Sequence, residues 1–213
     1  MNKAAELYLW YQNRAAIGAF LVDGKTEYDW SKGCAVCGTD SRQGDVLHTS
    51  ISRPVKRAVN LLNTKQIVLH TRCVELFDTR SLRVCSVLRK GGSVIDDVVQ
   101  VIPQITLPPM LPTTTGKTTE ASCAHCGRDG HYNIPHVELD AHYKREDVLK
   151  LVDFDKPQIV ATWECFGPSR KAPRPPFYRV IVAQPRPVVT AAAAEVIRGL
   201  VGKAAYFWPV VLE

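Results

Sequence analysis

Two short cysteine pairs carry the clearest chemical signal in this 213-residue sequence. Each pair is a Cys-x-x-Cys-Gly motif, and the two motifs lie far apart in the chain. Such a turn offers two thiolates from one tight loop, and its glycine lets the backbone turn back beneath the sulfur atoms. A tetrahedral Zn²⁺ ion needs four ligands of this kind, so two motifs brought face to face complete a site. We therefore predict one structural zinc ion held by Cys34, Cys37, Cys123 and Cys126.

Two other uses of these cysteines remain open at the level of sequence. Each motif could form its own metal site with ligands from elsewhere in the chain. A Cys-x-x-Cys pair also serves thiol exchange, but it then usually opens a helix after a strand, and neither pair precedes a clear helix. The candidate extra ligands are His70 and Cys73 for the first motif, and His131, His136 or His142 for the second.

Sequence motifs for enzymatic chemistry are absent. A shell of four cysteines leaves no open position for the water that a catalytic zinc activates. The zinc-protease motif His-Glu-x-x-His, the zinc-deaminase motif, the Gly-x-Ser-x-Gly turn and the P-loop do not occur. We therefore predict a structural metal and no enzymatic activity. Free cysteine is among the most buried residue types, so small core thiols are expected at the other three positions, Cys73, Cys85 and Cys165.

Composition and charge are those of a globular protein. The hydrophobic fraction is 46 % and the charged fraction 23 %, which excludes a wholly disordered or fibrous chain. The net charge is +6, and basic residues gather in two tracts, 53–90 and 170–186. If the two tracts share a face, they could bind nucleic acid through its phosphates. With no signal peptide and no apolar run of membrane-spanning length, we expect a cytoplasmic protein without membrane contact.

The elements that must position the cysteines divide the chain into two halves. We expect an α+β fold with two small mixed α/β halves, 1–105 and 121–213. Each half carries one Cys-x-x-Cys-Gly motif, which we call a knuckle. The zinc and a Pro/Thr-rich linker over 106–120 would join them. Apolar spacing and capping residues predict helices over 3–20, 53–62, 145–154 and 190–200. Strands are predicted over 46–49, 66–70, 82–88, 94–105, 158–163, 178–183 and 205–212.

The second motif and the residues after it resemble a known family. The stretch that begins at Cys123 contains CAHCGRDGH, then VELDAHYKREDVLKLVDF, then IVATWECFG. It is similar to the double-CxxCG-motif family, known chiefly as myxobacterial paralogues. The ending at Pro209 and Val210 also looks like that of some members. Both knuckles here have Ala where the family usually has Pro after the first cysteine.

Some members of that family are immunity proteins that protect a cell from a toxin. The resemblance implies a metal role for the four cysteines and a zinc-stabilised binding protein that neutralises a cognate bacterial toxin by direct contact. Occlusion of the toxin's active site would be the mechanism. The alternative is a zinc-ribbon-like nucleic-acid-binding protein that uses the basic tracts 53–90 and 170–186.

Overall fold

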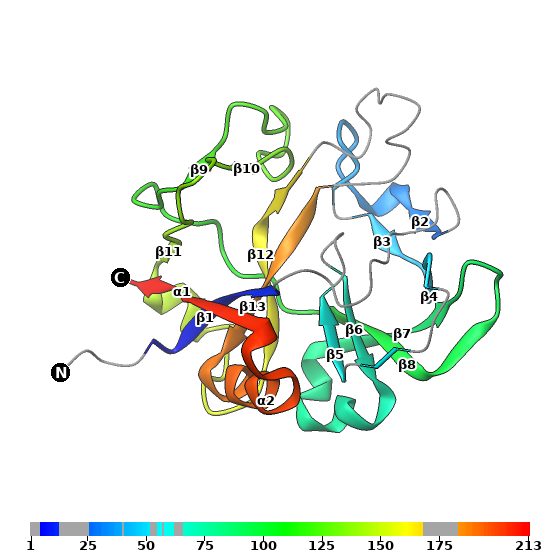
Figure 1. Cartoon of the computed structure of the whole chain (residues 1–213). Helices are drawn as coiled ribbons and strands as arrows, with labels where there is room; N and C mark the ends of the chain where they lie inside the picture. The colour runs from blue at the N-terminus through cyan, green and yellow to red at the C-terminus, as the bar shows by residue number, and fades with distance from the viewer. Residues whose placement is uncertain are drawn as a thin grey trace.

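The computed structural model describes residues 5–12, 26–39, 41–51, 55–56, 58–61, 66–167 and 183–213. Within these residues the chain forms the predicted α+β structure (Figure 1). It contains a five-stranded sheet, a four-stranded sheet and three two-stranded ribbons. Among the helices of these residues, none has the length and apolar character needed to cross a membrane.

The five-stranded sheet is built from the first half of the chain. Its order is β4-β7-β8-β6-β5, with β4 parallel to β7 and the other neighbours antiparallel. Two 3-10 helices, Thr71–Leu76 and Thr79–Ser81, connect β6 to β7. The predicted strands over 46–49, 66–70, 82–88 and 94–105 are confirmed. The strands are β4 (Val46–His48), β5 (Val59–Leu61), β6 (Ile67–His70), β7 (Leu82–Leu88) and β8 (Val94–Pro103).

The helix predicted over 53–62 is wrong where the structure describes it. Val55 and Lys56 are not helical, and residues 59–61 form β5, antiparallel to β6. Val59 pairs with Leu69 and is fully buried, so its β-branched side chain packs on the sheet, and this packing outweighs the helical spacing. Residues 53–54, 57 and 62 of that prediction lie outside the described part.

The four-stranded sheet joins the two ends of the sequence. Its order is β12-β13-β1-β14, with every neighbour antiparallel. The strands predicted over 158–163 and 205–212 are found, whereas most of the strand predicted over 178–183 lies outside the described residues. The strands are β1 (Leu7–Gln12), β12 (Ile159–Phe166), β13 (Gln184–Thr190) and β14 (Ala205–Pro209).

The helix predicted over 3–20 is therefore wrong over Leu7–Gln12, which form the strand β1. Leu7 and Leu9 belong to one core cluster, whereas Trp10 belongs to a second cluster, against which Tyr8 also packs. This is the period-2 alternation of a strand with both faces covered. A short segment that is apolar on both faces has no polar stripe, so its spacing cannot distinguish a strand from a helix. Residues 3–4 and 13–20 of that prediction lie outside the described part.

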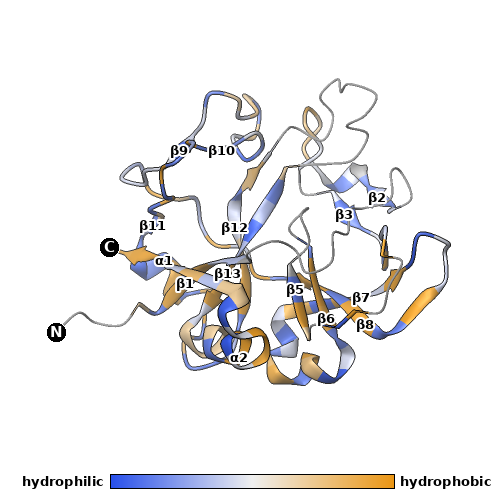
Figure 2. Cartoon of the chain, in the orientation of Figure 1, coloured by the Kyte–Doolittle hydropathy of each residue, from blue (hydrophilic) through white to orange (hydrophobic). Residues whose placement is uncertain are grey.

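A shared hydrophobic core holds the two sheets together. Trp10 and Val189 of the four-stranded sheet pack in the same cluster as Leu69 and Val101 of the five-stranded sheet. Helix α2 (Ala191–Val201) completes this cluster with its buried face (Figure 1). Figure 2 shows hydrophobic stretches on β5, β6 and β8, and Val59, Leu69 and Val101 of these strands belong to this cluster. The two halves of the sequence therefore share one hydrophobic cluster, to which none of the four predicted cysteine ligands belongs.

Capping residues set the limits of α2 as predicted. The Thr190 hydroxyl accepts a hydrogen bond from the Ala193 backbone N–H (3.3 Å), and Gly202 ends the helix at a φ of 57°. A positive φ favours glycine. The predicted helix over 145–154 is also present but shorter, as α1 (Arg145–Leu149).

The Pro/Thr-rich segment packs along β12. The Leu107 N–H donates to the Ala161 carbonyl (2.8 Å), and the Ala161 N–H donates to the Ile105 carbonyl (2.9 Å). Leu107 and Met110 are buried in the core on the far face of the four-stranded sheet. The remaining short elements are β2 (Tyr28–Asp29), β3 (Arg42–Gln43), β9 (Lys117–Thr118), β10 (Tyr132–Asn133), β11 (His142–Tyr143), β15 (Val211–Leu212) and the 3-10 turns Trp30–Lys32 and Gly202–Ala204.

Candidate metal centre

The two Cys-x-x-Cys-Gly motifs adopt the same backbone turn. In the first, the Gly38 N–H donates to the Cys34 carbonyl at 2.7 Å, and in the second the Gly127 N–H donates to the Cys123 carbonyl at 2.7 Å. Both glycines have a positive φ, 77° and 70°, which residues with a Cβ rarely adopt. The glycine that follows each motif therefore closes the loop and aims both thiols of the motif to one side.

The structure brings all four predicted ligands together. Their sulfur atoms lie within 4.8 Å of one another, and Cys37 Sγ is 3.5 Å from Cys126 Sγ. A tetrahedral zinc site with Zn–S bonds of about 2.3 Å has sulfur atoms about 3.8 Å apart, so the cluster has the dimensions of such a site. Within the described residues it is the one group of three or more such ligands that could hold a metal ion: Cys34, Cys37, Cys123 and Cys126.

The electrostatics of the cluster favour cation binding. Burial opposes ionisation of Cys34, but N–H groups of Cys37 and Val36 and the neighbouring thiols donate to its sulfur and together lower its pKa to about 6. Burial raises the pKa of Cys37 and of Cys126. Thiols packed this closely cannot all ionise by themselves, whereas a divalent cation at their centre would replace their protons.

The first knuckle carries an additional contact from its own loop. Cys37 is buried, and its sulfur lies 3.2 Å from the Thr39 hydroxyl oxygen and 3.5 Å from the Thr39 backbone nitrogen. Hydrogen bonds to a ligand sulfur hold its orientation and stabilise its thiolate. Thr39 was not among the predicted site residues, although its place two residues after the second cysteine of the motif could have indicated it.

Each knuckle is attached to a different part of the fold. The second is fixed to the end of β12, because the Cys165 N–H donates to the Arg128 carbonyl (2.6 Å) and Arg128 Nε donates to the Trp163 carbonyl (2.9 Å). The first leads directly into β3, whose Gln43 exchanges side-chain hydrogen bonds with Gln100 of β8. A shared ion would therefore connect the loop that leads into β3 to the end of β12.

The histidines considered as alternative ligands are engaged elsewhere. His70 Nε2 lies 2.9 Å from the Val55 carbonyl, and His131 Nε2 lies 2.8 Å from the Gly127 carbonyl. His142 lies between the carboxylates of Asp140 and Glu213. His136 is outside the cysteine cluster as well.

The remaining cysteines follow the prediction for core thiols. Cys73, Cys85 and Cys165 are all buried and outside the cluster. The basic tracts come together only in part: Arg83 and Arg186 line one cavity. Several other basic residues of the tracts lie outside the described part of the chain, namely Arg53, Arg57, Lys65, Arg170, Lys171, Arg174 and Arg179.

Comparison of the chain with protein-family models, curated proteins and solved structures finds no match. The assignment of the site therefore depends on its own geometry.

Proposed function

We propose that the four cysteines hold one Zn²⁺ ion and that the protein is an immunity-type binding protein, which neutralises a cognate bacterial toxin by direct contact. The observation that supports this most is the four-thiol cluster. Four protein ligands around zinc leave no position for a substrate or an activated water. Such an ion stabilises the fold and catalyses no reaction, so the protein would act by binding a partner through its surface.

A hollow on the four-stranded sheet has the character of a protein-binding surface. Its volume is about 620 Å³, and its wall includes Tyr11, Tyr206, Trp208 and Val137. Tyr206 and Val137 are 46 % and 47 % exposed. Tyrosine and tryptophan dominate the residues that contribute most to binding at protein interfaces, so we place the toxin contact here.

Co-purification with a neighbouring gene product tests this proposal. The zinc-loaded protein is co-expressed with the product of an adjacent toxin-like gene and captured through a tag. A complex is expected that survives washing and protects the host, and Tyr206→Ala weakens it by tenfold or more, about 1.4 kcal/mol. Val84→Ala is the control, because Val84 is 46 % exposed but lies on β7 of the other sheet. Capture of nucleic acid without any toxin would refute the immunity role.

Nucleic-acid binding is the second candidate, and one observation favours it. Arg83 from the first basic tract and Arg186 from the second line the same cavity, as a shared binding face requires. Binding to duplex DNA would then weaken with salt, with a log–log slope of about −0.9 per phosphate contacted. An absence of binding to DNA and RNA at low salt would exclude this candidate.

A further inference from the structure

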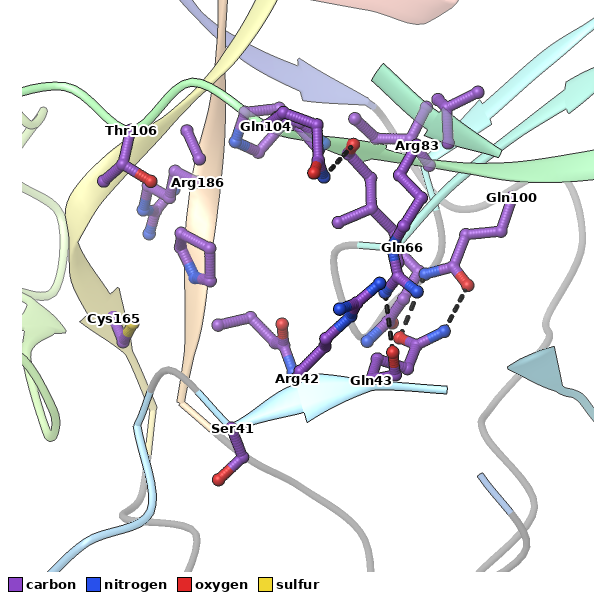
Figure 3. A pocket seen from close by; sticks show the side chains of 18 of the residues that line it. Ser41, Arg42, Gln43, Gln66, Arg83, Gln100, Gln104, Thr106, Cys165 and Arg186 are labelled. Atoms are coloured by element: carbon purple, nitrogen blue, oxygen red, sulfur yellow. Dashed lines mark hydrogen bonds between the residues drawn. The ribbon is translucent and has the colours of Figure 1, made fainter. Parts of the chain in front are cut away.

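A polar cavity lies between the two sheets. It has a volume of about 550 Å³, within the usual range of small-molecule sites. Figure 3 shows side chains entering it from opposite sides: Thr106, Cys165 and Arg186 on one, and Arg42, Gln66 and Arg83 on the other. One wall comes from β3 and from β7 and β8 of the five-stranded sheet. The other comes from β12 and β13 of the four-stranded sheet.

The walls of this cavity are cationic. Four arginines line it, and the described lining residues include no aspartate or glutamate. Two of the four have partners among the described residues. Arg83 pairs with Asp45 (3.0 Å), which is 87 % exposed, and Arg128 donates to the Trp163 carbonyl. The other two lining arginines are Arg42 and Arg186.

Arg186 is held in place without a carboxylate. Its guanidinium carbon lies 4.4 Å from the ring centroid of Phe166 and 4.9 Å from that of Tyr11, and Nη2 donates to Asn133 Oδ1 (2.7 Å). Its Nε is buried without a hydrogen-bond partner. Among the described residues it makes no ion pair, and burial lowers its pKa from the ordinary value of arginine. A preoriented cation of this kind favours a bound anion, with phosphate or carboxylate as the matching group.

Gln66 supplies a second, independent sign of a ligand. It is 5 % exposed, it lines the cavity, and neither its amide nitrogen nor its amide oxygen has a hydrogen-bond partner. By contrast, Gln43 and Gln100 satisfy each other through two side-chain hydrogen bonds. Buried polar groups are almost always paired, so an unpaired buried amide at a cavity wall is an open site for a group that both donates and accepts.

We propose that this cavity binds a nucleoside 5′-phosphate, whose phosphate contacts the arginines and whose base contacts the amide of Gln66. A base edge offers adjacent donors and acceptors that a glutamine amide can match, and the phosphate matches guanidinium groups without a competing acid on the wall. The ligand is a free nucleotide or the 5′ end of a nucleic-acid strand, since both present the same group. The inference does not depend on the immunity role.

Titration calorimetry on the zinc-loaded protein tests this site. The probes are AMP, GMP, CMP and UMP, each measured separately, with ribose 5-phosphate and inorganic phosphate for comparison. At least one nucleotide is expected to bind with a Kd of about 10–100 µM and at least tenfold more tightly than ribose 5-phosphate. A 5′-phosphorylated dinucleotide of the same first base assigns the site to a strand end if it binds equally well, and to free nucleotides if it is excluded.

Matched variants locate the binding. Gln66→Leu breaks no hydrogen bond of the free protein, so it stays folded, and we expect it to weaken nucleotide binding about tenfold or more while ribose 5-phosphate binding stays unchanged. Arg42→Gln, at an exposed position, is expected to weaken both ligands. Arg72→Gln removes the same charge from an exposed residue that does not line the cavity and should leave binding unchanged. The proposal is overturned if no nucleotide binds more tightly than inorganic phosphate, or if Gln66→Leu and Arg42→Gln bind like the unsubstituted protein.

Discussion

Removal of the metal should weaken the fold by an amount that follows from chain topology. Cys37 and Cys126 are separated by 89 positions in sequence, and their sulfur atoms are 3.5 Å apart. A cross-link that closes a loop of about 100 residues lowers the conformational entropy of the unfolded chain. It thereby raises the free energy of unfolding by about 4–5 kcal/mol. The two sheets share a hydrophobic core, so the metal-free protein is expected to stay folded. Its free energy of unfolding should fall by about 4–5 kcal/mol, and its melting temperature by about 10–20 °C.

Guanidinium denaturation with and without a zinc chelator measures this effect. We expect the chelator to lower the midpoint strongly in the unsubstituted protein and to have no effect in Cys126→Ser, which lacks one ligand. Cys85→Ala is the matched control, because Cys85 is buried but lies outside the cluster. That variant should lose some packing energy and keep the full chelator response. A midpoint that neither chelator nor added zinc changes would refute the cross-link argument.

Three further predictions concern other parts of the molecule. Gln66→Leu should raise the free energy of unfolding by about 1–2 kcal/mol, because it removes a buried amide without partners; a lower value in urea denaturation would contradict this. Gly130→Ala should lower the free energy of unfolding by about 2–4 kcal/mol, because Gly130 has a φ of 78° and an added Cβ would overlap a backbone carbonyl. Gly91→Ala is the control and should be nearly neutral, because the space around Gly91 is open. Equal effects of the two substitutions would refute the argument. The hydrogen bond to Glu213 raises the pKa of His142, and the same bond lowers the pKa of Glu213. The histidine contribution to stability is therefore complete below its ordinary value of 6.5 and is lost as pH rises through the higher folded value, whereas the glutamate contribution is lost as pH falls below its ordinary value of 4.5. Melting temperatures should thus fall more between pH 6 and 8.5 in the unsubstituted protein than in His142→Gln, and parallel curves would contradict the pairing.

The four-cysteine cluster is the part of the site that sequence could predict. A Cys-x-x-Cys-Gly motif encodes its own turn, since Gly38 and Gly127 supply the positive φ that closes each loop. Only the pairing of the two motifs required the fold, and four ligands of one chemical type made that pairing the simplest solution.

The cavity could not be predicted, because it is assembled from distant strands. Arg42 lies on β3, Gln66 immediately precedes β6, and Arg186 lies on β13. None belongs to a local motif, and only the folded chain shows that Gln66 lacks hydrogen-bond partners.

The wrong helix prediction at Leu7–Gln12 has a related origin. A strand in the interior of a sheet, with both faces covered, has no polar alternation, and its partners β13 and β14 lie near the other end of the sequence.

The most direct test of the account is the coordination of zinc by the four cysteines. X-ray absorption at the zinc edge, together with metal analysis, should give one zinc per chain bound by four sulfur atoms at about 2.3 Å. Cys34→Ser and Cys123→Ser should each lose this tetrathiolate site, because in the proposal one ion is shared between the two knuckles. Two zinc ions per chain, nitrogen or oxygen ligands in the unsubstituted protein, or loss of only one of two ions in each variant would contradict the account.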